Sequence, residues 1–296
     1  MGNEAWTFLG HPVGSDDLDL IRTIVGEFAG LSRDELAATV CELLDWTRAT
    51  GRVKTRECRD LLERLEMAGL ITLPAKRVGR PLGARTAVPI TARGDVQAAV
   101  IATVGDLAPL AIVRVITAEQ RALFRELVGR HHYLGHAVPF GAHVRYLIYA
   151  SHPPRQVVAC AQFSSAAWRM ACRDAWIGWD DATRVRQLPR VVTNSRFLIL
   201  PWVRVKNLAS TILAQLARRI GADWQAAYGV RPVLLETLID SARFDGASYR
   251  AANWIVVGMT TGRGRNDRGA RHTVRVPKRV LIYPLVGDAA QQLRGH

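Results

Sequence analysis

The stretch SRFLILPWVRVKNLASTILAQLARRIGADWQAAYGVRPVLLETLID, residues 195–240, predicts an apolar strand, a long helix and a second apolar strand in direct succession. The first strand is SRFLILPWV (195–203), the helix is NLASTILAQLARRIGADWQAAYG (207–229), and the second strand is RPVLLETLI (231–239). Apolar residues recur at helical spacing in the middle segment, whereas the flanking segments are short apolar runs. This alternation predicts an α/β domain built on a mixed sheet.

The segments on both sides of this stretch continue the alternation of strands and helices. Before it we expect a strand, a helix that Thr117 caps, and a hairpin, in the segments AIVRVIT (111–117), AEQRALFRELVGRHH (118–132), HVRYLIYA (143–150) and RQVVACAQFS (155–164). After it we expect a short helix and two strands, in DGASYRAANW (245–254), IVVGMTTG (255–262) and RVLIYPL (279–285). The order is strand, helix, hairpin, strand, helix, strand, helix and strands.

The N-terminal part has a different pattern, that of a winged helix-turn-helix. Three helices are predicted, followed by a short strand with a basic tip, at 18–28, 33–46, 54–68 and 70–77. Ser32 and Glu35 have the spacing of a capping box at the start of the second helix. Residues 74–95 are rich in Pro and Gly, which is typical of a linker. We therefore predict a winged-helix domain with a basic linker at 1–95 and a mixed-sheet domain at 96–296.

Basic residues are distributed unevenly along the chain. The 296 residues carry 40 Lys and Arg against 26 Asp and Glu, a net charge of +14. Residues 1–95 have a net charge of −1, so the +15 excess lies in 96–296, where Lys206 and Lys278 are the only lysines. The guanidinium of arginine binds phosphate through two hydrogen bonds, so this excess of arginine predicts a nucleic-acid partner. The alternative is a solubilising surface.

In the N-terminal part the charges favour DNA only weakly. The third helix has basic residues but also Glu57, Asp60, Glu63 and Glu66. DNA contact there would use the first turn of the helix and the wing, at Lys54, Arg77 and Arg80. The alternative is a winged helix that contacts protein.

Composition excludes several classes of protein. Hydrophobic residues make up 49% and charged residues 22%, which is typical of a globular chain. No apolar run reaches 18 residues, so we expect no membrane span. The N-terminus lacks the pattern of a secretory signal, and the four cysteines show no CxxC pair. We therefore expect a cytoplasmic protein with reduced thiols.

The element order of the second part resembles the GNAT N-acyltransferase fold. In that family a loop of pattern Q/R-x-x-G-x-G/A holds the pyrophosphate of coenzyme A at a helix start, and the matching stretch here runs from Arg204 to Ala209. Asn207 replaces its first glycine, and glycine permits close approach to phosphate, whereas Ala209 stands at the second position, where the family tolerates Ala. The resemblance thus implies the fold, while the loop predicts that acetyl-CoA is not the cofactor.

A second resemblance covers nearly the whole chain. It is carried by HHYLG (131–135), SAAWRMACRDAWIGW (165–179), NSRFLILPWVRVKNLAS (194–210), LLETLID (234–240), RFDGASYRAANW (243–254) and VGMTTGRGR (257–265). These motifs resemble the DruA family, which is known from Druantia anti-phage systems and occurs beside mobile elements. The likeness implies a role in phage defence or in a mobile element, with defence or transposition proteins as further partners.

A weaker likeness is to phage Mom proteins, GNAT-like enzymes that modify adenine in DNA and use iron. His132-Tyr133 and Asp240…Tyr249 occupy comparable places in the predicted fold. This likeness implies that His132, Tyr133, Asp240 and Tyr249 take part in catalysis.

Two carboxylates in an apolar strand are the sharpest chemical signal. Glu236 and Asp240 lie four residues apart in LLETLID, so they share one face of the strand. Burial of an ionised group in such a strand costs free energy unless the group is paired or binds a metal. With His132 they predict a site for divalent Mg, Mn or Fe. The alternative is a pair of salt bridges to Arg196 or Arg243, and His132-Tyr133 has the alternative of a packed helix end.

Further residues are candidates for contact with nucleic acid. Aromatic and basic residues interleave in the 166–190 insertion, amide and basic groups flank the fourth strand, and the 261–276 loop is basic. The candidates in these segments are Trp168, Arg169, Arg173, Asn194, Arg196, Arg204, Lys206, Arg263, Arg265 and Arg268. The alternatives are a small tryptophan core, a turn cap at Asn194 and a solvated loop.

These features favour a metal-dependent enzyme that modifies or cleaves DNA. Its proposed centre is His132, Tyr133, Glu236, Asp240 and Tyr249. Two other functions stay open: a DNA-binding or adaptor subunit without catalysis, which the basic half and altered cofactor loop also explain, and, less favoured, an acyltransferase.

Overall fold

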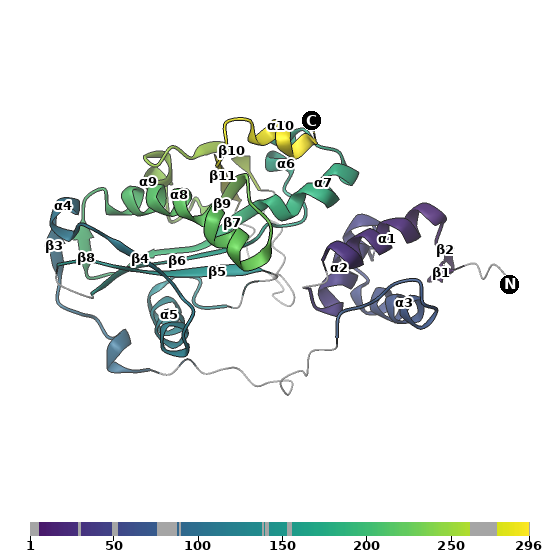
Figure 1. Ribbon diagram of the computed structural model, residues 1–296, viewed down its shortest axis with the longest axis horizontal. Coiled ribbons are helices and arrows are strands. Elements are labelled where there is room, and N and C mark those ends of the chain that lie inside the picture. Colours follow the sequence, from purple (N-terminus) through teal and green to yellow (C-terminus); the bar gives the residue numbers. More distant parts are fainter. Residues whose placement is uncertain are drawn as a thin grey trace. The chain divides into compact units, whose positions relative to one another are not determined.

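The computed structural model describes residues 6–28, 31–48, 53–75, 88, 90–137, 139, 142–152, 156–260 and 277–295. Two compact units divide the chain, Met1–Arg85 and Thr86–His296 (Figure 1). Among the helices of the described ranges, none has the length and apolar character to cross a bilayer.

Three helices form most of the first unit, as the sequence predicts. The elements are β1 (Thr7–Phe8), β2 (His11–Pro12), α1 (Ser15–Glu27), α2 (Arg33–Leu43) and α3 (Thr55–Met67). The capping box is present, because Ser32 Oγ accepts from the Glu35 N–H and the Glu35 carboxylate accepts from the Ser32 N–H. Gly69 follows α3 with φ +73°, the left-handed conformation of a helix C-cap.

The predicted wing is not formed in the described part of this unit. Residues 70–75 have no strand conformation. Their main chain is bonded to side chains of helices instead: Leu73 N–H donates to Glu66 Oε1 (2.9 Å), and Pro74 O accepts from Arg33 Nε (2.9 Å). Residues 76 and 77 of the predicted strand lie outside the described residues. The structure therefore supports a three-helix unit and does not confirm a winged helix.

A seven-stranded mixed sheet forms the centre of the second unit. Its spatial order is β10-β11-β9-β7-β6-β5-β4. The strands are β4 (Ala111–Arg114), β5 (His143–Tyr149), β6 (Val157–Ser165), β7 (Val191–Ile199), β9 (Leu234–Asp240), β10 (Ile255–Met259) and β11 (Lys278–Pro284). All neighbouring strands pair antiparallel except β7 and β9, which run parallel. The predicted mixed sheet is confirmed, and so is the predicted order of its elements along the chain.

Helices cover both faces of this sheet (Figure 1). Helix α5 (Ala118–His131) lies on one face, and α8 (Leu208–Tyr228) and α9 (Ala247–Arg250) lie on the other. The 166–190 insertion forms α6 (Ala171–Ile177), α7 (Asp181–Gln187) and η2 (Leu188–Arg190), next to α10 (Ala289–Arg294). The remaining elements are η1 (Ala92–Gly94), β3 (Val100–Ala102), α4 (Val104–Leu107) and β8 (Val203–Val205), where β3 and β8 form a separate parallel pair.

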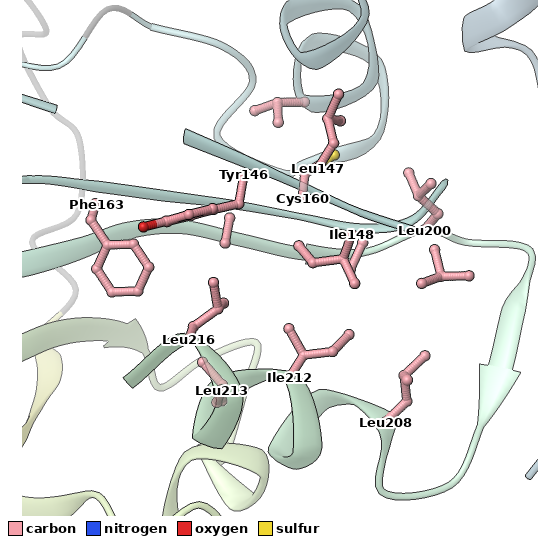
Figure 2. Close-up of a cluster of buried hydrophobic side chains, with 14 of the residues drawn as sticks. Tyr146, Leu147, Ile148, Cys160, Phe163, Leu200, Leu208, Ile212, Leu213 and Leu216 are labelled. Carbon is pink, nitrogen blue, oxygen red and sulfur yellow. The ribbon is translucent and has the colours of Figure 1, made fainter. Parts of the chain in front are cut away.

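Apolar side chains between α8 and the sheet make the larger core. Figure 2 shows Ile212, Leu213 and Leu216 of α8 facing Tyr146 and Ile148 of the sheet. The side chains on alternate strand positions, among them Leu147 and Cys160, point to the opposite face, where α5 packs. The two-residue alternation of the strands and the helical spacing of α8 thus produce two apolar layers around one sheet.

Residues 91–95 are bonded to α5 and belong to the second compact unit. The Glu126 carboxylate accepts from Thr91 Oγ1 (2.7 Å), and Arg130 Nη2 is 2.7 Å from Asp95 Oδ1. A Cβ on Gly94 would lie 2.4 Å from Glu126 Oε1, so glycine allows this close approach. These contacts explain why the compact units divide at Arg85 and Thr86, ten residues before the predicted linker ends.

Candidate functional site

A cavity opens where β7 and β9 separate. These parallel strands pair only through Val191–Thr193 and Leu234–Glu236. Beyond that point a cavity of about 460 Å³ lies between them, lined by residues 131–134, 194–199, 201, 209, 237–239 and 244–249. Of the predicted centre and nucleic-acid residues, the structure brings His132, Tyr133, Asn194, Arg196 and Tyr249 together in this lining.

A β-bulge in β7 shapes the cavity wall. Gln162 of β6 pairs with Arg196, but the next residue, Phe163, pairs with Asn194. Ser195 is therefore an extra residue in β7. Bulges of this kind redirect side chains at sites where a strand must open. Here the bulge lies within a strand whose three central residues, Asn194, Ser195 and Arg196, all line the cavity.

Asn194 and Tyr249 form a buried hydrogen-bonded pair in the wall. Tyr249 Oη donates to Asn194 Oδ1 at 2.5 Å, and Asn194 Nδ2 donates to Gln162 O at 3.1 Å. Thr237 Oγ1 donates to the main-chain oxygen of Asn194 at 3.0 Å. Burial raises the pKa of the Tyr249 phenol, so the phenol is protonated at neutral pH. Asn194 is thus a strand residue of the cavity and does not cap a turn.

Arg196 brings a cation to the cavity without a carboxylate to neutralise it. Its Nε donates to Gly135 O (3.1 Å) and its Nη1 to Ser195 O (2.7 Å). Within the described residues it forms no ion pair, and burial lowers the pKa of its guanidinium. A partly buried cation of this kind favours an anionic or strongly polar ligand.

His132 presents a neutral ring to the cavity. Its Nδ1 accepts from the Leu134 N–H at 3.1 Å, so the neutral ring carries its proton on Nε2. Burial, together with the nearby Arg196 cation, lowers the pKa of His132 to about 4. At neutral pH the ring is therefore a hydrogen-bond donor through Nε2.

Two exposed aromatic rings border the cavity. Tyr133 is 38% exposed and Phe244 is 50% exposed, with their ring centroids 5.4 Å apart. The Arg243 guanidinium lies 5.3 Å from the Tyr133 centroid. Burial and the negative charge of Asp240 raise the pKa of Tyr133. Exposed aromatic surface beside cations is typical of sites where bases stack.

Glu236 differs from its expected place in the cavity. Its carboxylate is fully buried, accepts from Thr193 Oγ1 (2.6 Å) and pairs with Arg173 Nη1 (3.1 Å). Glu236 does not line the cavity. Glu236 therefore forms a salt bridge, as the alternative interpretation of the sequence predicts. Its partner is Arg173 of α6, not Arg196 or Arg243. The pair ties the 166–190 insertion to the sheet.

Asp240 is bonded within its own turn. Its Oδ1 accepts from the Ala242 N–H (3.1 Å), and its Oδ2 lies 3.4 Å from Arg243 Nε. The salt-bridge alternative to Arg243 therefore describes Asp240.

The three predicted metal ligands do not fit a divalent ion. The oxygens of Glu236 are bonded to Thr193 and Arg173, and the available lone pair of His132 accepts from a main-chain N–H. In the part of the chain that the structure describes, no three His, Cys, Asp or Glu side chains gather as a metal site requires. We therefore derive no step through a metal at these residues.

Several residues expected at nucleic acid have structural roles. Trp168 is 4% exposed with Arg184 over its ring, and Arg173 is fully buried, so neither offers a surface for a base or a phosphate. Arg169 is exposed and pairs with Asp181 (3.0 Å). These placements correct the expectation for Trp168 and Arg173, because both side chains are buried in the insertion.

Among the remaining nucleic-acid candidates, Arg204 and Lys206 are described in the second unit and are not part of the cavity lining. Arg204 and Lys206 are exposed just before α8, and Lys54 caps α3 with its Nζ 5.8 Å from the Phe8 ring. Arg77, Arg80, Arg263, Arg265 and Arg268 lie outside the described residues.

Asn207 keeps the backbone conformation that glycine would supply. Its φ and ψ are 63° and 0°, in the left-handed region that Asn tolerates better than most residues. The replacement thus changes the side chain before α8 but not the turn.

Sequence reasoning missed Phe244 and the polar residues Arg145 and Gln162 of the strands. Phe244 carries no local signal, because it joins Tyr133 only through the fold. Arg145 and Gln162 stand in the apolar strands HVRYLIY and VVACAQFSS, the same signal that singles out Glu236.

Comparisons with solved structures find acetyltransferases. Spermidine N-acetyltransferase from Vibrio cholerae in a dodecameric structure matches at 8% identity, over 49% of this chain and 66% of that chain, with a TM-score of 0.31. A chimera of that enzyme, SpeG from Vibrio cholerae, with hSSAT matches at 8% identity, over 60% and 96%, with a TM-score of 0.40. An N-acetyltransferase from Staphylococcus aureus matches at 11% identity, over 60% and 99%, with a TM-score of 0.36.

No curated protein matches the sequence at a significant level. One family model does match, that of the Druantia protein DruA, over residues 65–273. This range covers well over half of the chain, including both strands that flank the cavity. It confirms the resemblance carried by the motifs around Tyr133, Asn194 and Tyr249. The chain belongs to the DruA family.

Proposed function

We propose that this protein acts on DNA, in phage defence or in a mobile element, and that its cavity receives a single nucleotide whose base it modifies. The supporting observation is the lining of the cavity. It combines the unneutralised Arg196 cation, the Asn194–Tyr249 pair and the exposed rings of Tyr133 and Phe244.

The size and chemistry of the cavity suit an unstacked nucleotide. A volume of about 460 Å³ lies in the range of small-molecule sites. Enzymes that act on a base take it out of the stack and hold it between apolar or aromatic groups and hydrogen-bond donors. Tyr133 and Phe244 offer aromatic faces, while Arg196 and the Nε2–H of His132 offer donors.

Base modification agrees with the geometry better than cleavage by a metal held at Glu236 and Asp240. Those carboxylates are bonded to Arg173 and Arg243, and only Asp240 is partly exposed. Tyr249 lies in the lining with its hydroxyl protonated at neutral pH, and we assign it to proton transfer in the reaction. His132 is a neutral ring whose Nδ1 accepts from the Leu134 N–H, so we assign it to hydrogen bonding of the base through Nε2.

The second candidate is a DNA-binding or adaptor subunit that recruits defence or transposition proteins. The +15 charge of residues 96–296 favours it. The salt bridge of Glu236 with Arg173 also favours it, because a carboxylate with a structural role leaves fewer groups for catalysis.

Incubation with DNA separates these functions. Single- and double-stranded DNA would be treated with the full chain plus Mg, Mn or Fe, then analysed by gel and by nucleoside mass spectrometry. We expect a nucleoside of changed mass in unbroken strands without added acetyl-CoA, with water as the co-reactant, so that an exocyclic amine leaves as ammonia and a carbonyl oxygen takes its place. Strand breaks would contradict base modification, binding without any product would favour the adaptor, and an acetylated product that requires acetyl-CoA would favour acyl transfer.

DNA binding is expected to weaken steeply with salt. Six phosphate contacts by arginines of the basic half would lower affinity by about 10³-fold between about 50 and 200 mM salt, because bound counterions are released. Fluorescence anisotropy of a labelled oligonucleotide measures this. An affinity that does not change over the same range would contradict a nucleic-acid partner.

A further inference from the structure

A row of polar side chains crosses three strands on the α5 face of the sheet. Arg145 of β5 pairs in register with Gln162 of β6, and Gln162 pairs with Arg196 of β7, so all three project from one face. Arg145 Nε donates to Gln162 Oε1 (2.8 Å), and Gln162 Nε2 donates to Ser195 Oγ (3.2 Å). The row ends at the cavity, because Ser195 and Arg196 line it.

Arg145 is a buried cation that forms no ion pair with any acid of the described residues. It is 9% exposed, and the Phe124 ring of α5 lies 5.5 Å from its Cζ. Its Nη2 is buried and has no hydrogen-bond partner in the part of the chain that the structure describes. Burial and the nearby Arg125 and Arg121 lower the pKa of its guanidinium. Burial of a charge without a partner raises the free energy of the folded protein, so a ligand that binds this guanidinium would offset much of that cost.

His136 supplies a second unpartnered polar atom in the same surroundings. Its Nε2 is buried and has no hydrogen-bond partner among the described residues. The charged and titratable groups that act on the ring are Arg125 of α5, Arg145 and His143 of β5, and Arg196 of β7, all basic. Burial and these groups lower the pKa of His136 to about 4. Two buried polar atoms from separate elements, with basic groups around them, favour an anionic ligand.

We propose that Arg145, His136 and Arg125 form a binding site for a phosphate group beside the cavity. A tetrahedral phosphate has enough oxygens to accept from the Arg145 Nη2, the His136 Nε2 and the Arg125 guanidinium together. Arg125 is half-buried, so its guanidinium is the part of the site that reaches solvent, whereas the Nη2 of Arg145 and the Nε2 of His136 are buried. The site is linked to the cavity through Gln162 and Ser195, so the phosphate belongs to a nucleotide next to the one in the cavity. The choice of DNA as the source of the phosphate rests on the proposed function, whereas the phosphate site itself does not.

The pKa of His136 reports occupation of the site. NMR of the His136 ring in the full chain would be followed against pH, with and without inorganic phosphate at constant ionic strength. An anion in contact with the ring favours its protonated form, so we expect the pKa to rise by about one unit or more. A pKa that stays near 4 throughout the phosphate titration would overturn the proposal.

Substitution of Arg145 tests the assignment. Arg145→Gln should abolish the effect of phosphate on His136, whereas Arg231→Gln, at an exposed arginine bonded to Gln225, should leave it unchanged. If Arg145→Gln does not fold, Arg125→Gln replaces it, because within the described residues the Arg125 side chain donates only to Arg121 O of its own helix. Arg125→Gln should weaken phosphate binding about tenfold. An unchanged phosphate affinity in the folded variants would contradict the site.

A single-stranded oligonucleotide separates this proposal from the proposed function. If inorganic phosphate moves the His136 resonance and the oligonucleotide does not bind, the site takes free phosphate or a mononucleotide and the DNA proposal fails. If the oligonucleotide binds and neither ligand moves the His136 resonance, the DNA proposal stands and the phosphate site fails.

Discussion

Arg173→Met is expected to lower the free energy of unfolding by about 3–5 kcal/mol, because it leaves the buried Glu236 carboxylate without its cation. Arg173 also donates to the main-chain oxygens of Ala167 (2.8 Å) and Trp168 (3.2 Å), which would lose these donors. Urea unfolding followed by tryptophan fluorescence measures the loss.

Arg169→Met is the matched control for this prediction. Arg169 lies in the same insertion and pairs with Asp181, but both side chains are more than half exposed. Exposed pairs of this kind contribute about 0–1 kcal/mol. The double variant Arg173→Met/Glu236→Leu should recover much of the stability, since it removes the buried charge as well. If Arg173→Met is as stable as Arg169→Met and has lost activity on DNA, Glu236 belongs to the active centre and our structural role for it is wrong.

Tyr249→Phe is expected to reduce product formation on DNA by about 10²–10⁴-fold, the range of general acid–base contributions. The substitution keeps the ring that packs against Trp254 and Phe197, and removes the hydroxyl that donates to Asn194 Oδ1. DNA affinity should therefore change little, while the rate falls. Single-turnover kinetics with nucleoside mass spectrometry separates the two quantities.

Tyr149→Phe is the control, at a partly buried tyrosine of β5 outside the cavity lining. It should leave both the rate and the affinity unchanged. A Tyr249→Phe protein with full activity would show that the hydroxyl only positions Asn194. Equal losses in Tyr249→Phe and Tyr149→Phe would show a general effect on folding.

Local signals in the sequence predict most of the fold. The capping box at Ser32 and Glu35, the Thr117 cap of α5 and the apolar spacing of α8 each lie within one element, so the sequence alone contains them. The predicted wing differs because side chains of two helices, Glu66 of α3 and Arg33 of α2, bond the main chain of Leu73 and Pro74, and the pattern of residues 70–77 contains no sign of these bonds.

The candidate site is predictable in part for the same reason. Asn194, Arg196 and Tyr249 stand next to the strands that open, and their convergence follows from the fold class. The partner of Glu236 does not follow from the fold class, because Arg173 lies 63 residues away in an insertion whose path has no local signal in the sequence. A charged residue in an apolar strand indicates only that it needs a partner. Glu236 has Arg173 as its partner, whereas Arg145 forms no ion pair within the described residues and donates to Gln162.

Photocrosslinking tests the nucleotide-binding cavity most directly. A single-stranded oligonucleotide containing 5-iodouracil would be irradiated with the full chain, and the crosslinked peptides would be mapped by mass spectrometry. We expect crosslinks at Tyr133 or Phe244, the exposed rings of the cavity, and their loss in Arg196→Gln. Crosslinks confined to residues outside the cavity lining, unaffected by Arg196→Gln, would contradict the account.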